Sequence, residues 1–140
     1  MQYLTQHAFS PTPQTVRAAR DFAMQALDSW GGCRRRDDIQ VCVSELASNA
    51  VQHGSPESRD YLLRLIRHPH CLHIEVHDST RHSPVCTPPA SPSAESGRGM
   101  YIVQELCDDW GVSSTDDDGK IVWTCFHRPE AHTSRCSCTP

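Results

Sequence analysis

The stretch SELASNAVQHG, residues 44–54, places three polar side chains at a regular spacing inside an otherwise amphipathic segment. Glu45, Asn49 and His53 are four residues apart, so they lie along one stripe of a helix. The apolar positions around them predict a helix that continues to His53, and Gly54 is the residue type that most easily ends one. Because these apolar positions are adjacent to the stripe, the stripe lies at the rim of the core. The spacing alone leaves two interpretations open, a solvated helix face and a binding site.

The composition is that of a single domain. The chain has 140 residues, of which 37% are hydrophobic, and we expect one domain over residues 1–128 and a disordered C-terminal tail over residues 129–140. The net charge of −4 argues against general nucleic-acid binding, which needs clustered cations. No apolar run approaches the roughly 20 residues of a membrane span, and the first residues lack the features of a signal peptide. We therefore expect a cytoplasmic protein with no membrane partner.

The hydrophobic pattern predicts strands in pairs and helices between the pairs. The predicted elements are a strand at residues 3–9, helices at 16–30 and 39–53, a hairpin at 61–68 and 71–78, a helix that opens at 97–99, and a hairpin that turns at 116–119. Residues 79–96 are rich in proline and show no periodicity, and a connection of this length is usually functional or disordered. This order predicts an α+β two-layer sandwich, with a mixed or antiparallel sheet and the helices on one face.

Two other stretches are predicted to face solvent. Arg34, Arg35 and Arg36 precede two aspartates, which favours a solvated loop. Alternation along residues 71–78 places one cysteine, two histidines and one glutamate on the same face of a strand. We interpret this face as solvent-exposed in preference to a metal site, whose ligands usually come from turns or helix ends. The eight cysteines include no CxxC pair and are predicted to be free thiols.

Two further segments carry polar groups that suit a nucleotide. Asp78 ends an apolar strand, where a carboxylate can accept a hydrogen bond from an exocyclic amine, although an ordinary strand-end aspartate is the alternative. Gly97 and Gly99 precede a helix, where glycines let backbone N–H groups approach an anion and the helix terminus adds partial positive charge. A plain helix start with two glycines is the alternative there.

The order of these motifs resembles the GHKL superfamily of ATP-binding domains. It is most similar to the branch that contains the bacterial anti-sigma factor serine/threonine kinases and their actinobacterial relatives. SELASNAVQHG resembles the N box of that family, VHDSTRHSP (residues 76–84) its first glycine box, ESGRGMYIVQELCDDWGV (95–112) its second, and GKIVWTCF (119–126) its closing strand. The resemblance extends from Phe9 to Phe126 and implies a Bergerat-type ATP-binding fold.

The resemblance implies a role for each motif. Glu45 would be the general base, Asn49 the Mg²⁺ ligand, and Asp78 the acceptor for the adenine amino group. The polar stripe, with His53, would face the nucleotide, and residues 79–96 would form the ATP lid. The phosphates would be bound, chiefly through backbone N–H groups, by Gly97, Arg98, Gly99 and Met100. The cofactors implied are ATP and Mg²⁺.

The chain departs from the family pattern around Asp78. The kinases of this branch typically carry a glycine shortly after that aspartate, whereas Ser79 and Thr80 follow it here. The closing strand of the family often carries a threonine near the position of Ile121, whereas Thr124 lies three residues further on in this chain.

Two functions remain open from the sequence. The first is an anti-sigma factor type regulator that phosphorylates a serine or threonine of a STAS-type anti-sigma-factor antagonist and binds a sigma factor. The second is a non-catalytic module of the same fold that binds nucleotide or sequesters a partner. Turnover that depends on Glu45 distinguishes them. The resemblance also implies a homodimer.

Overall fold

The computed structural model describes residues 3–53, 59–78, 98–114 and 119–127 and contains five strands and three helices within them. The elements are, in chain order, β1 (Tyr3–Phe9), α1 (Gln14–Ser29), α2 (Arg36–His53), β2 (Tyr61–Arg67), β3 (Cys71–Asp78), α3 (Arg98–Leu106), β4 (Asp109–Ser114) and β5 (Lys120–His127). Each element predicted from the hydrophobic pattern is present, and its order along the chain is confirmed.

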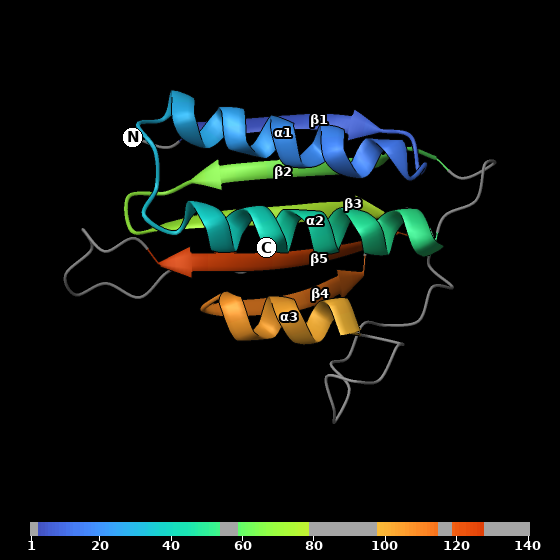
Figure 1. Ribbon diagram of the computed structural model, residues 1–140. Helices are drawn as coiled ribbons and strands as arrows, with labels where there is room; N and C mark the ends of the chain where they lie inside the picture. Colours follow the sequence, from blue (N-terminus) through green and yellow to red (C-terminus); the bar gives the residue numbers. More distant parts are fainter. Residues whose placement is uncertain (1–2, 54–58, 79–97, 115–118, 128–140) are drawn as a thin grey trace.

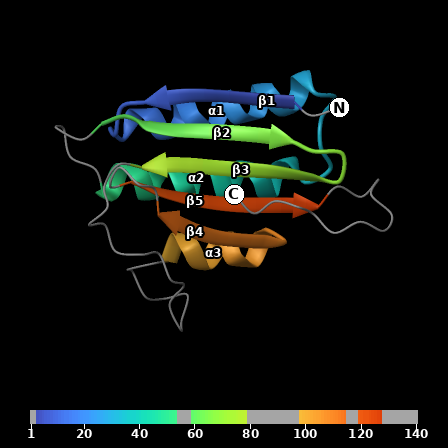
Figure 2. The same ribbon diagram turned by 180° about the vertical axis from the view of Figure 1, so that it is seen from behind.

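The strands form one antiparallel sheet in the order β1-β2-β3-β5-β4. The three helices lie side by side on one face of this sheet, and the opposite face carries no helix among the described residues (Figures 1 and 2). The predicted α+β two-layer architecture is therefore confirmed, and the sheet is antiparallel in all of its described pairs.

The main core lies between the helices and the sheet. Leu72, Ile74 and Val76 alternate along β3 and contribute the sheet side of this core. Ile39, Cys42, Val43, Leu46, Ala47 and Ala50 line the buried side of α2. α2 lies along the middle strands, between α1 and α3 (Figure 1).

The opposite face of the sheet differs from its prediction. Cys71, His73 and Glu75 are buried there, so the expected solvent-exposed strand face is wrong. The Trp123 ring of β5 stacks on the His73 ring at 5.6 Å between centroids, and it also lies over Gly111, where a Cβ would come within 2.7 Å of the indole. A large side chain on the neighbouring strand therefore covers positions that alternation alone assigns to solvent.

Glu75 is held in this layer by two histidines. Its carboxylate oxygens lie 2.9 Å from Nε2 of His73 and 2.7 Å from Nε2 of His77. These hydrogen bonds, led by the one from His73, lower the pKa of Glu75 to about 2, although burial acts in the opposite direction. Cys71 is disulfide-bonded, so the prediction of free thiols is wrong at that position, whereas Cys33, Cys42 and Cys107 are free.

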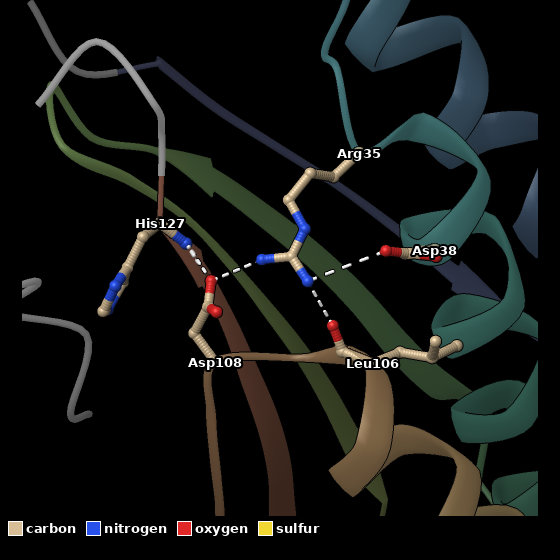
Figure 3. A network of polar contacts seen from close by, with 5 residues as sticks. All are labelled: Arg35, Asp38, Leu106, Asp108 and His127. Atoms are coloured by element: carbon tan, nitrogen blue, oxygen red, sulfur yellow. Dashed lines mark hydrogen bonds and ion pairs between the residues drawn. The ribbon is translucent and has the colours of Figure 1, made fainter.

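The basic run before α2 is structural and not simply solvated. Arg35 donates to Asp108 Oδ2 at 2.5 Å and to the backbone carbonyl of Leu106, and it lies 3.6 Å from Asp38 Oδ2 (Figure 3). The backbone N–H of His127 also donates to Asp108 Oδ2, at 2.7 Å. This network joins the start of α2 to the end of α3 and the end of β5.

Several predicted features lie outside the described residues. These are Gly54, the proposed lid at residues 79–96, Gly97, the turn at 116–118 and the tail from residue 129. Within the described ranges, none of the helices is long and apolar enough to cross a bilayer.

Candidate functional site

The predicted site residues that the structure describes gather at one end of the molecule. The C-terminal half of α2, the start of α3, the end of β3 and the start of β5 all lie at this end (Figure 1). The Arg35 network lies at the other end of α2, so it does not take part in the site. Antiparallel pairing of β3 with β5 is the reason that Asp78 and Lys120 meet here, although they are far apart in sequence.

Glu45 directly contacts the start of α3. A Cβ added to Gly99 would lie 2.7 Å from Glu45 Oε2 and 3.6 Å from Glu45 Cδ. Gly99 therefore leaves the space that the carboxylate occupies, and any side chain there would displace it. The predicted N box and the predicted second glycine box are joined at this contact.

Asn49 lies one helical turn beyond Glu45 on the same face of α2. Both side chains are half-buried, and the adjacent core position, Cys42, is fully buried. The stripe is thus at the rim of the core, on the side of α2 that faces α3, and not on its solvated back. The side chain of His53 is outside what the structure describes, so its predicted contact with nucleotide stays a prediction.

The first turn of α3 provides backbone donors. Arg98 is the first helical residue, and the N–H groups of a first turn have no acceptor within the helix. The Met100 side chain is buried in the core, so only its backbone can serve a ligand, as the sequence analysis expected. The helix terminus adds partial positive charge at the same place, which favours an anion. The side chain of Arg98 is not among those described.

Asp78 is buried at the end of β3, on the face that carries Ile74 and Val76. Its cross-strand partner is Lys120, the first residue of β5, which is also buried. Lys120 was not predicted as a site residue. Two signals pointed to it: it is the only lysine in the chain, and it opens an apolar strand directly after a Gly.

The register also shows which residue of the closing strand faces Asp78. Ile121 pairs with His77 and points to the opposite face of the sheet from Asp78. Thr124 is fully buried opposite Ile74, four residues along β5 from Lys120. The position across from the aspartate is therefore occupied by a lysine, and neither residue considered from the sequence stands there.

The donor and acceptor set suits Mg²⁺-ATP. The first-turn N–H groups of α3, which have no acceptor within the helix, match phosphate oxygens, and the amide oxygen of Asn49 is a hard ligand of the kind that Mg²⁺ accepts beside phosphates. In the part of the chain that the structure describes, no group of three or more His, Cys, Asp or Glu side chains could hold a metal ion by itself.

Residues 9–126 match the family described as the histidine kinase-like ATPase domain. The chain belongs to this family. The matched residues include all four segments that form the site, from α2 to the start of β5. Membership of the histidine kinase-like ATPase domain family supports ATP as the ligand class. No curated protein matches the chain.

Proposed function

We propose that this ATPase domain is an ATP- and Mg²⁺-binding regulator of the anti-sigma factor type, which phosphorylates a serine or threonine of a STAS-type antagonist. One observation carries the proposal: the carboxylate of Glu45 lies against Gly99 at the start of α3, with Asn49 one turn further along the same face. A carboxylate so close to the expected phosphate-binding turn is suited to a general base, whereas a site that only binds nucleotide needs no base there.

The proposed reaction is an in-line phosphoryl transfer. The hydroxyl oxygen of the acceptor forms a bond to the γ-phosphorus, the bond from that phosphorus to the bridging oxygen of ADP breaks, and Glu45 takes the hydroxyl proton. The backbone N–H groups of Arg98, Gly99 and Met100, together with Gly97, would stabilise the charge on the phosphate oxygens.

The other site residues would bind and orient the nucleotide. Asn49 would hold Mg²⁺, which when bound neutralises phosphate charge. Asp78 would accept a hydrogen bond from the base, and His53 would complete the stripe that faces the nucleotide. The buried position of Asp78 supports this role, because exclusion of water strengthens a hydrogen bond to a carboxylate.

The proposal includes the partners and location expected from the resemblance. The protein would act in the cytoplasm, would bind a sigma factor as well as the antagonist, and would form a homodimer. It would bind neither nucleic acid nor membrane. The net charge of −4 supports the absence of a general nucleic-acid contact.

The test combines a binding measurement with a transfer measurement. The purified full chain is titrated with Mg²⁺-ATP by calorimetry and then incubated with γ-labelled ATP and a panel of purified STAS-type proteins from the same genome. We expect Asn49→Ala to lose Mg²⁺-dependent binding, and Glu45→Gln to keep binding and lose transfer of label. Ser48→Ala, on the exposed side of α2, is the matched control and retains both. Equal loss of binding in the Glu45 and Asn49 variants would contradict the separate roles.

A non-catalytic binding module is the second candidate, and one observation favours it. Lys120, a cation, faces the aspartate that would read the base. A cation at this position alters the base-binding end of the site without affecting the helices that hold Glu45 and Asn49. Binding of ATP with no transfer of label to any STAS-type protein, in the wild type as in Glu45→Gln, would establish this second function.

A further inference from the structure

Lys120 is a buried cation with no assigned role. The residue is 6% exposed, and in the part of the chain that the structure describes its Nζ has no hydrogen-bond partner. Nor is any carboxylate oxygen of the described residues within ion-pair distance of this ammonium. Lys120 faces the same side of the sheet as Asp78, directly across from it.

A buried ammonium group without an acceptor is unfavourable. It carries three donors and no acceptor, and removal of such a group from water is costly unless hydrogen bonds replace those to water. Position 120 begins a strand whose inward residues, Val122 and Phe126, are apolar. The ammonium at this position makes none of these apolar contacts and no hydrogen bond among the described residues, so it points to an acceptor on a ligand.

The position of Lys120 determines which part of a nucleotide it would meet. The phosphate-binding elements, Asn49 and the start of α3, lie on the helices, whereas Lys120 lies on the sheet beside Asp78. On the function proposed above, on which this inference rests, Asp78 reads the base. Lys120 would therefore read the base as well.

We propose that Lys120 is a specificity-determining residue that extends the base recognition of this site from adenine to guanine. A carboxylate that faces position 6 of a purine accepts from the 6-amino group of adenine but would oppose the 6-oxo group of guanine acceptor to acceptor. An ammonium beside the carboxylate reverses this penalty: Lys120 donates to O6 of guanine, and Asp78 accepts from its N1–H and N2–H groups. With adenine, Asp78 accepts from the 6-amino group and Lys120 donates to ring N1. Both purines thus satisfy both side chains.

The first test compares the two nucleotides in three proteins. The full chain is titrated with Mg²⁺-ATP and Mg²⁺-GTP by calorimetry, beside Lys120→Met and Arg17→Met. Arg17 is an exposed cation on α1, so its replacement is a control for the same change in net charge. We expect the wild type and the control to bind GTP within about tenfold of ATP, and Lys120→Met to increase the preference for ATP by about tenfold or more.

The second test uses the wild type alone, so it does not depend on the folding of a variant. Because Lys120 is the only lysine, a protein labelled with ¹⁵N at lysine Nζ gives one side-chain ammonium signal in an NMR spectrum. We expect ATP and GTP each to shift this signal and to slow the exchange of its protons with water. Inorganic tripolyphosphate, which has no base, should leave the signal unchanged.

Three outcomes would overturn the proposal. The first is a preference for ATP over GTP that is the same in the wild type and in Lys120→Met. The second is a Nζ signal that responds to tripolyphosphate as strongly as to ATP, which would assign Lys120 to the phosphates. The third, no binding of either nucleotide at millimolar concentration, would reject the proposed function as well, whereas the first two leave it intact.

Discussion

Gly99 shows how one missing Cβ shapes the site. In the first turn of α3, a methyl group at this position would lie 2.7 Å from Glu45 Oε2 and would displace the carboxylate. We expect Gly99→Ala to change the free energy of unfolding by less than about 1 kcal/mol, because the displaced group is the end of a flexible side chain and alanine favours helix. Phosphotransfer should fall by about tenfold or more, since the general base moves. Thermal unfolding and transfer of label are the two measurements.

The control for this prediction is a double-mutant cycle with Glu45→Gln. If Gly99 acts only through the position of the carboxylate, Gly99→Ala has no further effect on the residual rate of transfer that remains in Glu45→Gln. If the losses in transfer rate from the two substitutions are additive, Gly99 does not act through Glu45 and is needed for the close approach of the phosphates.

Glu75 gives a pH dependence that is independent of ligand. Its pKa in the folded protein is about 2, below its ordinary value of 4.5, because His73 and His77 donate to it. The ionised carboxylate therefore stabilises the fold above about pH 4.5, and this contribution is lost as the pH falls toward 2. It amounts to at most about 3.5 kcal/mol, since one pKa unit corresponds to about 1.4 kcal/mol.

We expect Glu75→Gln to lower the free energy of unfolding at neutral pH and to flatten its dependence on pH in the acid range. Urea unfolding measured from neutral to acid pH tests this prediction, with the exposed Glu105→Gln as control. An acid dependence in Glu75→Gln as steep as in the wild type would show that other groups cause it.

Single residues were predictable from sequence where their partners lie on the same element. Glu45 and Asn49 share a helix face, so their spacing alone placed them on one stripe. Lys120 was missed because its importance depends on the register between β3 and β5, which are separated by more than forty residues of chain. Long-range register is set by tertiary packing and not by local spacing.

At the scale of elements, the side chain of Arg35 holds the end of α3 by hydrogen bonds. Arg35 donates to Asp108 Oδ2 and to the Leu106 carbonyl, an acceptor left free at the end of α3, and its guanidinium lies 5.0 Å from the centre of the Phe126 ring. We expect Arg35→Ala to lower the free energy of unfolding by about 1–3 kcal/mol. The variant loses the hydrogen bond to the Asp108 carboxylate and the one to the Leu106 carbonyl at the end of α3.

Urea unfolding measures this loss, with Arg34→Ala as the control because that neighbouring side chain is exposed. Because α3 also carries Gly99, Arg35→Ala should weaken ATP binding as well, although Arg35 is remote from the site. A variant that is destabilised but binds ATP normally would show that α3 is held in place by its apolar contacts alone.

Elements were predicted well, and their exposed faces less well. Periods of two and of about 3.6 depend only on local sequence, so the strands and helices were found with small errors at their ends. The face of β3 that carries His73 and Glu75 was assigned to solvent because alternation implies one buried side. The Trp123 ring on the adjacent strand and the two hydrogen bonds to Glu75 make a polar layer stable there. Such burial depends on neighbouring strands, which local periodicity does not reveal.

At the scale of the whole molecule, the hairpins were predictable and the strand order was not. β2 with β3, and β4 with β5, are joined by short connections, so their pairing follows from sequence. The pairing of β3 with β5 joins the two hairpins, and with them Asp78 and Lys120. The site therefore exists only when the complete fold has formed, which couples nucleotide binding to the stability of the domain.

The rate at which the Cys42 thiol is alkylated measures this coupling between nucleotide binding and stability. It is fully buried between α2 and the core, and burial raises the pKa of its thiol to about 12, so it is protonated and inaccessible in the folded state. Alkylation of Cys42 then requires opening of the fold, whereas the half-buried Cys33, before α2, serves as the internal reference.

Mg²⁺-ATP at about 100 times its dissociation constant adds about 2.7 kcal/mol of stability. We expect it to slow alkylation of Cys42 by about a hundredfold, as measured by peptide mass spectrometry, and to leave Cys33 unchanged. In Asn49→Ala the slowing should disappear; if it persists there, the nucleotide is held without the asparagine and the role assigned to Asn49 is wrong.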